Sequence, residues 1–473
     1  MDYGSFFTLL YWLNALIAVW ITVRVVLDNR NPIVTFAWIF VLLFLPYIGL
    51  LLYFFFGRDA RKREYIKKRF REQIGQKVMF NYASNLKSKM PDSYSSLISY
   101  LEKSAKSYPM HGCGVSLMPA TSDFVDELLL EIAKAEEHIH MQFYIFEDDE
   151  LGTRVRDALI ERARSGVEVR LLYDSVGCWS VKKSFYDEIR RAGGYVESFL
   201  KVRFPLFTNK VNYRNHRKAV IIDGRLAFIG GCNIANRYIE GFNRGVWRDT
   251  MIAIRGSGVR AVQAMFLMDW LFANGSMVSG DRYFPVSECS GSDIVQLVVS
   301  NPVDLWRYIP DALVRTLYTA KSYVYLQTPY FMPTETLLKA MQHVALSGVD
   351  VRLMVPLHSD NTIVELASYS YLGTLLAAGV KVYLFEKGFL HAKTIVSDDA
   401  LSIVGSANLD FRSFEYNFEL SSYVYSDSFA AEMKAQFCRD MQCCRQLTLR
   451  EYESRGLSLR LRQSIARLFS PIL

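Results

Sequence analysis

The sequence predicts an α/β protein with two lobes that repeat one another, preceded by a two-helix transmembrane hairpin. Three observations lead to this prediction. A motif of His, Lys and Asp occurs twice with the same spacing, similar helix and strand patterns surround both copies, and the amino terminus has two long stretches without charge. Each repeat is expected to form a mixed sheet flanked by helices, and a pseudo-twofold axis should relate the two lobes.

The first 57 residues predict the hairpin. No charged residue occurs from Gly4 to Val23 or from Asn31 to Gly57, and each stretch can cross about 30 Å of hydrocarbon. A cleaved signal peptide is disfavoured because Asp2, rather than Lys or Arg, precedes the first stretch and a second stretch follows at once. A buried core helix is the other alternative. Pro46 and Gly49 are expected to kink the second helix without preventing the span.

Basic residues directly after the second stretch predict the orientation of the hairpin. The loop between the stretches carries only Arg24, Asp28 and Arg30. Lys and Arg concentrate on the cytoplasmic side of membrane proteins, so the lobes are expected in the cytoplasm, where this segment attracts anionic lipid by about 1 kcal/mol per basic residue. A net charge of +7 agrees with such contacts. The basic residues are Arg58, Arg61, Lys62, Arg63, Lys67, Lys68, Arg69 and Arg71.

Four segments are expected along the chain: the hairpin (1–57), a basic connector (58–109), a first lobe (110–291) and a second lobe (292–473). Matching segments extend well beyond the motif. Residues 142–146, 165–172 and 192–196 of the first lobe correspond to 327–331, 347–354 and 378–382 of the second. No low-complexity or Pro/Ser-rich linker separates the lobes, so we expect one rigid unit with the active site in the seam.

The repeated motif combines an imidazole, an ammonium and an amide. Residues two apart on a strand share a face, so the His and the Lys of each copy are expected to point into one cleft. Lys and Asn can hold the anionic oxygens of a phosphodiester, while His can attack phosphorus or transfer a proton. The Asp that completes each motif falls at a predicted turn, so we interpret it as structural. The two copies are His216, Lys218, Asp223 and Asn233, and His391, Lys393, Asp398 and Asn408.

Two carboxylates, Asp249 and Glu419, follow the motifs at comparable distances. A carboxylate that holds the second ring nitrogen of a reactive His fixes its tautomer and stabilises the imidazolium. The alternative is that both are ordinary charges at strand edges, and the repeat favours the orienting role. Arg237 and Arg412 each lie four residues after the motif Asn. Either guanidinium could reach the phosphate or lock its hairpin, and both interpretations stay open.

No metal site and no cofactor are predicted. The other five His lack the spacing of metal ligands, and the seven Cys include no further pair that would complete a zinc site. The seven Cys fit reduced thiols in a cytosolic domain. The Lys and Asn of the two motifs would supply the charge stabilisation that a metal supplies elsewhere.

The two motifs resemble the HKD motifs of the phospholipase D superfamily. Residues 213–218 and 408–414 are similar to the corresponding signatures of bacterial cardiolipin synthases, and the resemblance covers nearly the whole chain. It implies two phospholipase D-like lobes and a ping-pong reaction without a metal. One His forms a phosphohistidine, and the other protonates the departing alcohol and then deprotonates the incoming one. The resemblance favours His216 as the nucleophile and His391 as the acid and base.

The resemblance also implies a multi-pass protein of the bacterial cell membrane that joins two phosphatidylglycerols into cardiolipin and releases glycerol. Its partners would be phosphatidylglycerol and other anionic membrane lipids. A hydrolytic phospholipase D, or a synthase with another alcohol acceptor, would need the same residues. The predicted hairpin argues against a nuclease and a nucleic-acid partner, and two intact motifs argue against a non-catalytic membrane scaffold. The oligomeric state stays open.

The carboxy-terminal segment predicts an amphipathic helix. Apolar and basic residues alternate there in a way that fits either a helix lying on the membrane or an ordinary docking helix, and both stay open. The apolar residues are Leu457, Leu459, Leu461, Ile465, Leu468 and Phe469, and the basic ones are Arg455, Arg460, Arg462 and Arg467.

Overall fold

The computed structural model describes residues 3–27, 32–45, 47–53, 92–201, 213–241, 245–286, 288–302, 304 and 306–471. The chain divides into two compact units, one of residues 1–74 with 207–209 and the other of residues 75–206 with 210–473. The basic residues predicted to set the orientation, at positions 58–71, lie outside the described residues, as does most of the expected connector.

The amino-terminal unit contains helices α1 (Tyr3–Leu27), α2 (Pro32–Phe44) and α3 (Ile48–Leu52). Its small apolar core includes Val25 of α1 and Leu42 of α2. Helix α1 coincides with the first uncharged stretch, but the second stretch is divided between α2 and α3. Proline lacks the N–H that continues a helix, and Tyr47, directly after Pro46, has a φ of 68°. Within the described residues, no helix combines the length and the apolar character required to cross a bilayer.

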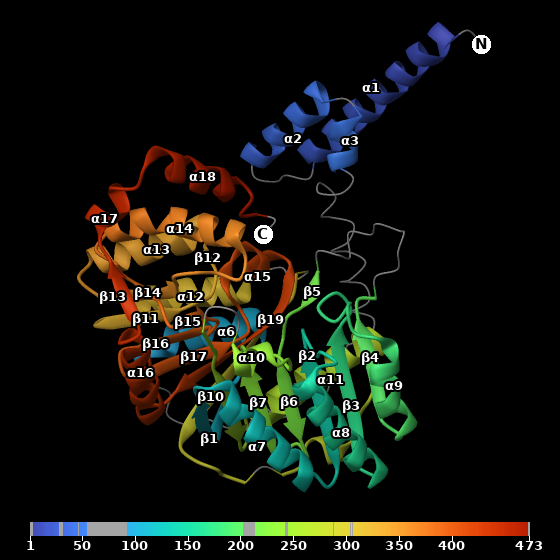
Figure 1. The fold of residues 1–473 in the computed structure, drawn as a ribbon, viewed down its shortest axis with the longest axis vertical. Helices are drawn as coiled ribbons and strands as arrows, with labels where there is room; N and C mark the ends of the chain where they lie inside the picture. Colours follow the sequence, from blue (N-terminus) through green and yellow to red (C-terminus); the bar gives the residue numbers. More distant parts are fainter. Residues whose placement is uncertain are drawn as a thin grey trace. The chain divides into compact units, whose positions relative to one another are not determined.

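The larger unit is built on one 16-stranded sheet. Apart from an extra strand at one edge, corresponding strands follow one another in the same order outward from its centre. From the centre outward, the first lobe runs β1-β9-β7-β6-β2-β3-β4 and the second runs β10-β19-β17-β16-β11-β13-β14, with β20 added at its edge. Strands β1 and β10 pair antiparallel at the centre. In each lobe three strands are parallel and the others antiparallel, so the predicted pair of lobes with mixed sheets is confirmed (Figure 1).

The strands of the two lobes match in order, and most of them also match in length. Those of the first lobe are β1 (Pro109–Met118), β2 (His138–Phe143), β3 (Glu168–Asp174), β4 (Tyr195–Phe199), β6 (Ala219–Ile222), β7 (Leu226–Gly230) and β9 (Met251–Arg255). Those of the second are β10 (Asp293–Ser300), β11 (Tyr323–Gln327), β13 (Asp350–Pro356), β14 (Lys381–Phe385), β16 (Thr394–Ser397), β17 (Leu401–Gly405), β19 (Asn417–Tyr425) and β20 (Cys444–Leu447). Shorter strands lie outside this order: β5 (Arg214–Asn215), β8 (Val246–Arg248), β12 (Phe331–Met332), β15 (Gly388–Leu390) and β18 (Leu409–Asp410).

Five helices repeat in the same order in each lobe. They are α7 (Thr121–Lys134), α8 (Glu150–Arg164), α9 (Lys183–Arg191), α10 (Arg237–Glu240) and α11 (Val259–Asn274), then α12 (Tyr308–Thr319), α13 (Glu335–Leu346), α14 (Thr362–Ala377), α15 (Phe411–Glu415) and α16 (Asp427–Met441). Outside the repeat lie α6 (Ser95–Ala105), α17 (Leu449–Glu453) and α18 (Leu457–Leu468). The agreement reaches the backbone: Gly166 and Gly348 end corresponding helices with the same φ of 93°, which an L side chain rarely adopts.

Each lobe has its own hydrophobic core, and alternation along the strands produces it. Val169 and Leu171 of β3 are fully buried in one core, and Val351 and Leu353 of β13 are buried in the other. One expectation about the motifs is wrong. His216 and Lys218 do not lie on one continuous strand, because residues 216–218 form an irregular link between β5 and β6, and residues 391–393 form the same link between β15 and β16.

Candidate active site

Short strands that connect the two lobes position the motif histidines. Strand β5 pairs with β19 of the other lobe, and β15 pairs with β8 of the other lobe, in both cases parallel. The His216 amide then donates to the carbonyl of Phe418 at 3.0 Å, and the His391 amide donates to that of Arg248 at 2.7 Å. Each accepting residue directly precedes a candidate carboxylate, Glu419 or Asp249. The link between strands therefore gives each His a fixed place beside an acidic side chain.

The two imidazole–carboxylate pairs cross between the lobes. His216 of the first motif has its Nδ1 3.0 Å from Oε1 of Glu419, and His391 of the second has its Nδ1 2.5 Å from Oδ2 of Asp249. Both carboxylates are fully buried, and both imidazoles are nearly so. The sequence-predicted carboxylates thus do contact the histidines, and each comes from the opposite half of the chain. Neither lobe holds a complete pair alone.

The two pairs have different supports, although their backbones match. A Cβ at Gly231 would lie 2.1 Å from Oδ1 of Asp249, so only glycine leaves room for this carboxylate. Ser406, at the corresponding place in the second motif, donates from Oγ to Oε2 of Glu419 at 2.5 Å. The longer Glu419 side chain leaves room for the side chain of Ser406, whereas the shorter Asp249 leaves no room for a side chain at position 231. This explains why the second motif has Gly-Ser where the first has Gly-Gly.

The motif lysines are buried beside the imidazoles. Nζ of Lys218 donates to the carbonyl of His216 at 2.6 Å, and Nζ of Lys393 donates to that of His391 at 2.5 Å. Burial lowers the pKa of Lys218 to about 7 and that of Lys393 to about 8, against the opposing attraction of Glu419 and Asp249. Two buried ammonium groups have lost most of their hydration, so an anionic ligand such as a phosphodiester would strongly stabilise their charged form.

The protonation states favour neutral imidazoles and ionised carboxylates. Burial lowers the pKa of His216, and burial with the charge of Lys393 lowers that of His391 to about 3. Burial opposes the ionisation of Glu419, but His216 and Lys218 outweigh it and hold the pKa of Glu419 at about 2. With Nδ1–H donating to the carboxylate, the lone pair of Nε2 is left for attack or proton transfer.

The lysine pKa values predict an alkaline limit to activity. A lysine is charged below its pKa, so raising the pH through about 7 to 8 should discharge the free site and lower kcat/KM, whereas bound phosphate should keep kcat high to a more alkaline pH. Initial rates on phosphatidylglycerol across this range would measure both profiles. In the Lys218→Arg variant the fall of kcat/KM should shift to higher pH, because a guanidinium does not lose its proton in this pH range. A flat kcat/KM profile to about pH 9 would contradict charged lysines as phosphate ligands.

The motif aspartates lie apart from this cluster and hold the backbone. The carboxylate of Asp223 accepts from the amides of residues 136–138 at 2.8–2.9 Å, at the start of β2. That of Asp398 accepts from the amides of residues 321–323 at 2.7–2.9 Å, at the start of β11. Both aspartates have a φ of 52°. These contacts agree with the structural interpretation of the two residues rather than with a role in chemistry.

The motif asparagines are buried next to the histidines but have partners in the protein. Oδ1 of Asn233 accepts from the amide of Ile145 at 3.1 Å, and Nδ2 donates to the hydroxyl of Tyr238 at 2.5 Å. Asn408 lies beside Asp410, whose pKa burial raises to about 6 despite hydrogen bonds from Ser413 and Asn408. Asn233 therefore holds the segments around Ile145 and Tyr238 together, and the phosphate contact expected from the sequence for both asparagines stays a prediction.

The symmetric arginines have different surroundings. Arg237 pairs with Glu147, with Nη1 to Oε1 at 2.8 Å. The residue that corresponds to Glu147 in the second lobe is Met332, and among the described residues Arg412 has no ion pair. Burial and Asp174 raise the pKa of Tyr144, and the charge of Arg412 opposes the rise. The ring of Tyr144 lies 5.1 Å from that of His216. Of the two arginines, only Arg237 has an ion pair among the described residues.

This difference gives a matched pair of variants. We propose that the Arg412 guanidinium, which has no ion pair among the described residues, contacts the phosphate. Arg412→Gln is then expected to lower kcat/KM at least about tenfold while the melting temperature changes little. Arg237→Gln should leave kcat/KM within about threefold and cost at most about 1 kcal/mol of stability, since it breaks a partly exposed ion pair. Rates and thermal unfolding of both variants test this. Equal effects of the two substitutions on kcat/KM would contradict a contact between Arg412 and the phosphate and would favour a structural role for both arginines.

Aromatic side chains surround His391, and the sequence analysis did not single them out. The rings of Trp247, Tyr238 and Phe389 lie 5.2, 5.6 and 5.7 Å from that of His391. Trp247 and Phe389 come from the paired strands β8 and β15. They restrict water around the imidazole. A signal was available in Trp247, which stands two residues before Asp249, but its direction depends on the pairing of distant strands.

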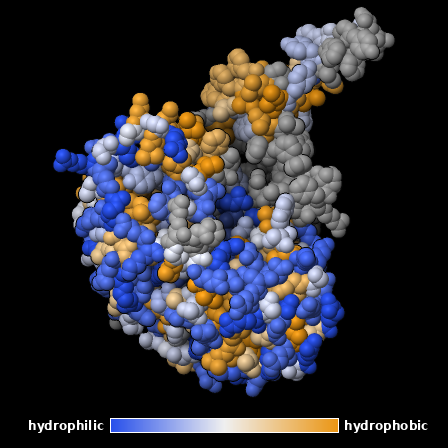
Figure 2. Space-filling view, viewed as in Figure 1, coloured by the Kyte–Doolittle hydropathy of each residue, from blue (hydrophilic) through white to orange (hydrophobic). Residues whose placement is uncertain are grey.

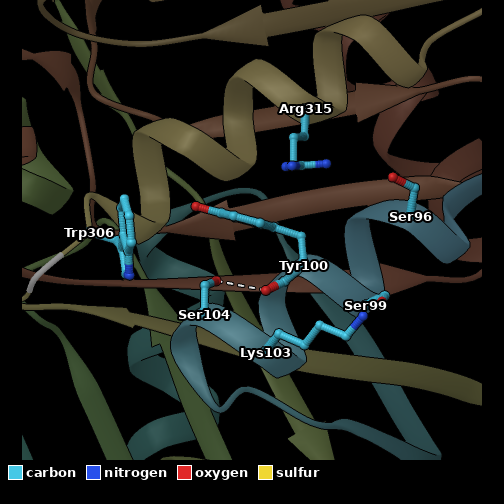
Figure 3. A pocket seen from close by; sticks show the side chains of 7 residues that line it. All are labelled: Ser96, Ser99, Tyr100, Lys103, Ser104, Trp306 and Arg315. Atoms are coloured by element: carbon cyan, nitrogen blue, oxygen red, sulfur yellow. Dashed lines mark hydrogen bonds between the residues drawn. The ribbon is translucent and has the colours of Figure 1, made fainter.

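A separate pocket of about 460 Å³ lies between α6 and the segment leading into α12. Tyr100, Lys103, Trp306 and Arg315 line it, and the Oγ of Ser104 donates to the carbonyl of Tyr100 at 2.7 Å (Figure 3). None of the motif residues borders this pocket. In the part of the chain that the structure describes, no cluster of three or more His, Cys, Asp or Glu could hold a metal ion.

Comparison with known proteins agrees with this site. The family described as cardiolipin synthase, PLD-like domain, matches residues 128–270 and 313–441, and the phospholipase D-nuclease N-terminal family matches residues 16–58. A solved phosphatidylserine synthase of Haemophilus influenzae Rd KW20 shares the fold at 14% identity, with a TM-score of 0.58 over 76% of this chain and 95% of that one.

Curated relatives match over nearly the full length. The major cardiolipin synthase ClsA of Bacillus subtilis is 37% identical, covering 98% of both chains. A cardiolipin synthase of Clostridium perfringens is 39% identical over 94% of this chain and 96% of that one, and cardiolipin synthase 1 of Staphylococcus aureus is 36% identical over 100% and 99%. Because a family match covers more than half of the chain and these relatives align almost end to end, the chain belongs to the cardiolipin synthase family of phospholipase D-like proteins.

Proposed function

We propose that the protein is a phosphatidyltransferase that makes cardiolipin from two molecules of phosphatidylglycerol and releases glycerol. The observation that carries the proposal is the pair of crossed imidazole–carboxylate contacts with a buried lysine beside each imidazole. This set supplies a nucleophile, an acid and base, and positive charge for one phosphodiester. The family relationship supports the choice of lipid substrate.

Two steps with opposite proton movements follow from the site. Nε2 of His216 attacks phosphorus of the first phosphatidylglycerol and the bond from phosphorus to the glycerol oxygen breaks. His391, which is neutral in the empty site and takes up a proton when the anionic phosphodiester binds, donates that proton to the glycerol oxygen. A hydroxyl of the second phosphatidylglycerol then gives its proton to His391 and attacks the phosphohistidine. The P–N bond breaks, which forms cardiolipin and frees His216. Glu419 and Asp249 stabilise the positive imidazole in each step, and Lys218 and Lys393 stabilise the phosphate oxygens.

The test is the product formed from vesicles of pure phosphatidylglycerol. Cardiolipin and glycerol are expected in equal amounts without any nucleotide-activated lipid, and mass spectrometry of the lipid phase measures the first. The nearly closed site favours a lipid hydroxyl held in place over water. Phosphatidic acid as the main product would establish a hydrolase instead. Cardiolipin that forms only with added CDP-diacylglycerol would establish a different donor.

We also propose that residues 1–57 anchor the protein in the bacterial cell membrane, with the lobes in the cytoplasm. Support comes from the two uncharged stretches and the basic residues that follow them. Helix α2 has 13 residues and is about 20 Å long, so a two-pass hairpin would need α3 to complete the second crossing. The full chain should then resist extraction by alkaline carbonate. Its release into the soluble fraction would contradict the anchor.

A further inference from the structure

Helix α18 exposes its apolar side and turns a small, partly polar side toward the protein. Leu457, Leu461 and Leu468 are 79%, 59% and 77% exposed. At 100° per residue these three leucines lie within about 40° of one another around the helix. Gln463 and Ala466, on the opposite side, are buried. A surface helix of a soluble protein normally has the reverse arrangement, with its leucines against the core.

The inner side of α18 is firmly held. The helix packs on α14, and Ala466 belongs to the hydrophobic core of the second lobe. The guanidinium of Arg467 lies 4.3 Å from the ring centre of Tyr371 in α14. The exposed leucines are therefore not the result of a detached tail, because the same helix contributes buried residues to the lobe. Figure 2 shows apolar side chains gathered over α18.

Basic residues border the exposed leucines on both sides. By the same helical geometry Arg460 and Arg467 lie along one edge of the apolar stripe, and Arg462 lies beyond the other. Among the described residues, Arg460 and Arg462 make no ion pair with an acidic side chain, and α18 contains no acidic residue. An apolar stripe with cationic edges matches the interface of a bilayer, where acyl chains meet anionic headgroups.

We propose that α18 lies on the surface of an anionic lipid bilayer, with Leu457, Leu461 and Leu468 inserted at the acyl boundary and Arg460 and Arg462 among the headgroups. This contact is additional to the proposed anchor at residues 1–57. A membrane is the expected partner for two reasons. The arginines complement anionic lipid in charge, and the proposed substrate resides in a membrane. The second reason rests on the proposed function, and the first does not.

Contacts inside the second lobe connect this membrane face to the active site. In α14, which carries α18, Oγ of Ser368 accepts from the amide of Phe331 at 3.2 Å. Phe331 lies in β12, which pairs with β18, the strand that directly follows Asn408. The neighbouring Tyr330 donates its hydroxyl to Asp360, just before α14, at 2.9 Å, and its ring lies 6.5 Å from that of His391. A bilayer bound to α18 would thus be held at a fixed place relative to the site.

Hydrogen–deuterium exchange of the full-length protein tests the contact without reference to activity. Amides of residues 457–468 are expected to exchange at least about threefold more slowly on phosphatidylglycerol vesicles than on phosphatidylcholine vesicles at the same protein density. Unchanged exchange would overturn the proposal. Protection that rises with protein concentration in detergent would assign the stripe to a second copy, and protection in detergent at every concentration would assign it to the amino-terminal helices of the same chain.

A double variant that introduces negative charge into the apolar stripe tests the consequence for turnover. Leu461→Glu with Leu468→Glu should abolish the exchange protection and lower cardiolipin formation on vesicles at least about fivefold, but leave the rate on phosphatidylglycerol in detergent micelles within about twofold. The matched control is Leu130→Glu with Leu346→Glu, because these leucines on α7 and α13 are 50% and 70% exposed. Equal loss in micelles, or equal loss in the control, would overturn the membrane role. Protection of α18 in a protein that makes no cardiolipin would contradict the proposed function alone.

Discussion

His216→Ala and His391→Ala are each expected to lower cardiolipin formation by at least about 10³-fold. Both imidazoles must act in each half of the reaction, one forming the bond to phosphorus and the other moving the proton, so the double variant should be little worse than either single one. Product mass from phosphatidylglycerol vesicles measures the loss. The result follows from geometry that gives each His its own carboxylate and its own lysine.

The control for these variants is His358→Ala. Its side chain is 51% exposed and its Nδ1 lies 3.7 Å from Oε2 of Glu365, away from the motif residues. This variant should keep wild-type activity and stability. If either motif variant retained more than about a tenth of wild-type turnover, a mechanism that requires both imidazoles would be wrong, because positioned proton transfer alone contributes about 10² to 10⁴.

The crossed carboxylates predict two different defects from two similar substitutions. Glu419→Gln removes the carboxylate charge that contacts His216 and should stop phosphohistidine formation. Asp249→Asn acts on His391 and should slow both steps, the second more than the first, because His391 must accept a proton there without a neighbouring negative charge, so some phosphohistidine should accumulate. Each should lower turnover by about 10² or more, and less than loss of the corresponding His. Acid-free trapping and peptide mass measurement locate the phosphate.

The assignment can fail in an informative way. Phosphate trapped on His391 in Glu419→Gln would exchange the roles of the two histidines. Trapped phosphate on His216 in both variants, in equal amounts, would contradict the crossed contacts as functional pairs. Glu147→Gln is a suitable control, because this carboxylate pairs with Arg237 and should leave the yield of phosphohistidine unchanged.

Much of the fold could be predicted from the sequence because the signals are local. Alternating apolar residues at 165–172 and 347–354, each after an amphipathic helical run, indicated the strands observed as β3 and β13. The repeat itself made two lobes necessary. The amino-terminal helices were harder, since a run without charge shows that a segment is apolar but does not show whether one helix continues through Pro46.

The motif histidines and lysines, and the two carboxylates, were likewise visible as residue types at repeated spacings. The expectation that His and Lys share one strand was wrong, because β5 and β15 leave their own sheets to pair with the opposite lobe. Hydrogen bonds to a neighbouring lobe compete with continuation of a strand, and no pattern within one segment records that competition. Arg237 and Arg412 also differ in their contacts, because Glu147, the ion-pair partner of Arg237, has no acidic counterpart in the second lobe.

The sequence by itself determined that the chain has two similar lobes, that each offers an imidazole, an ammonium and a nearby carboxylate, and that the aspartates of the motifs stand at turns. Only the tertiary structure decided which carboxylate serves which imidazole. Glu419 is 203 positions from His216 and Asp249 is 142 positions from His391, so these contacts require the two lobes to associate, as they do where β1 pairs with β10 in the shared sheet. The periodicity of apolar residues along a strand indicates which face of the sheet a residue lies on. Which residue it contacts there depends on the packing of segments that are distant in the sequence.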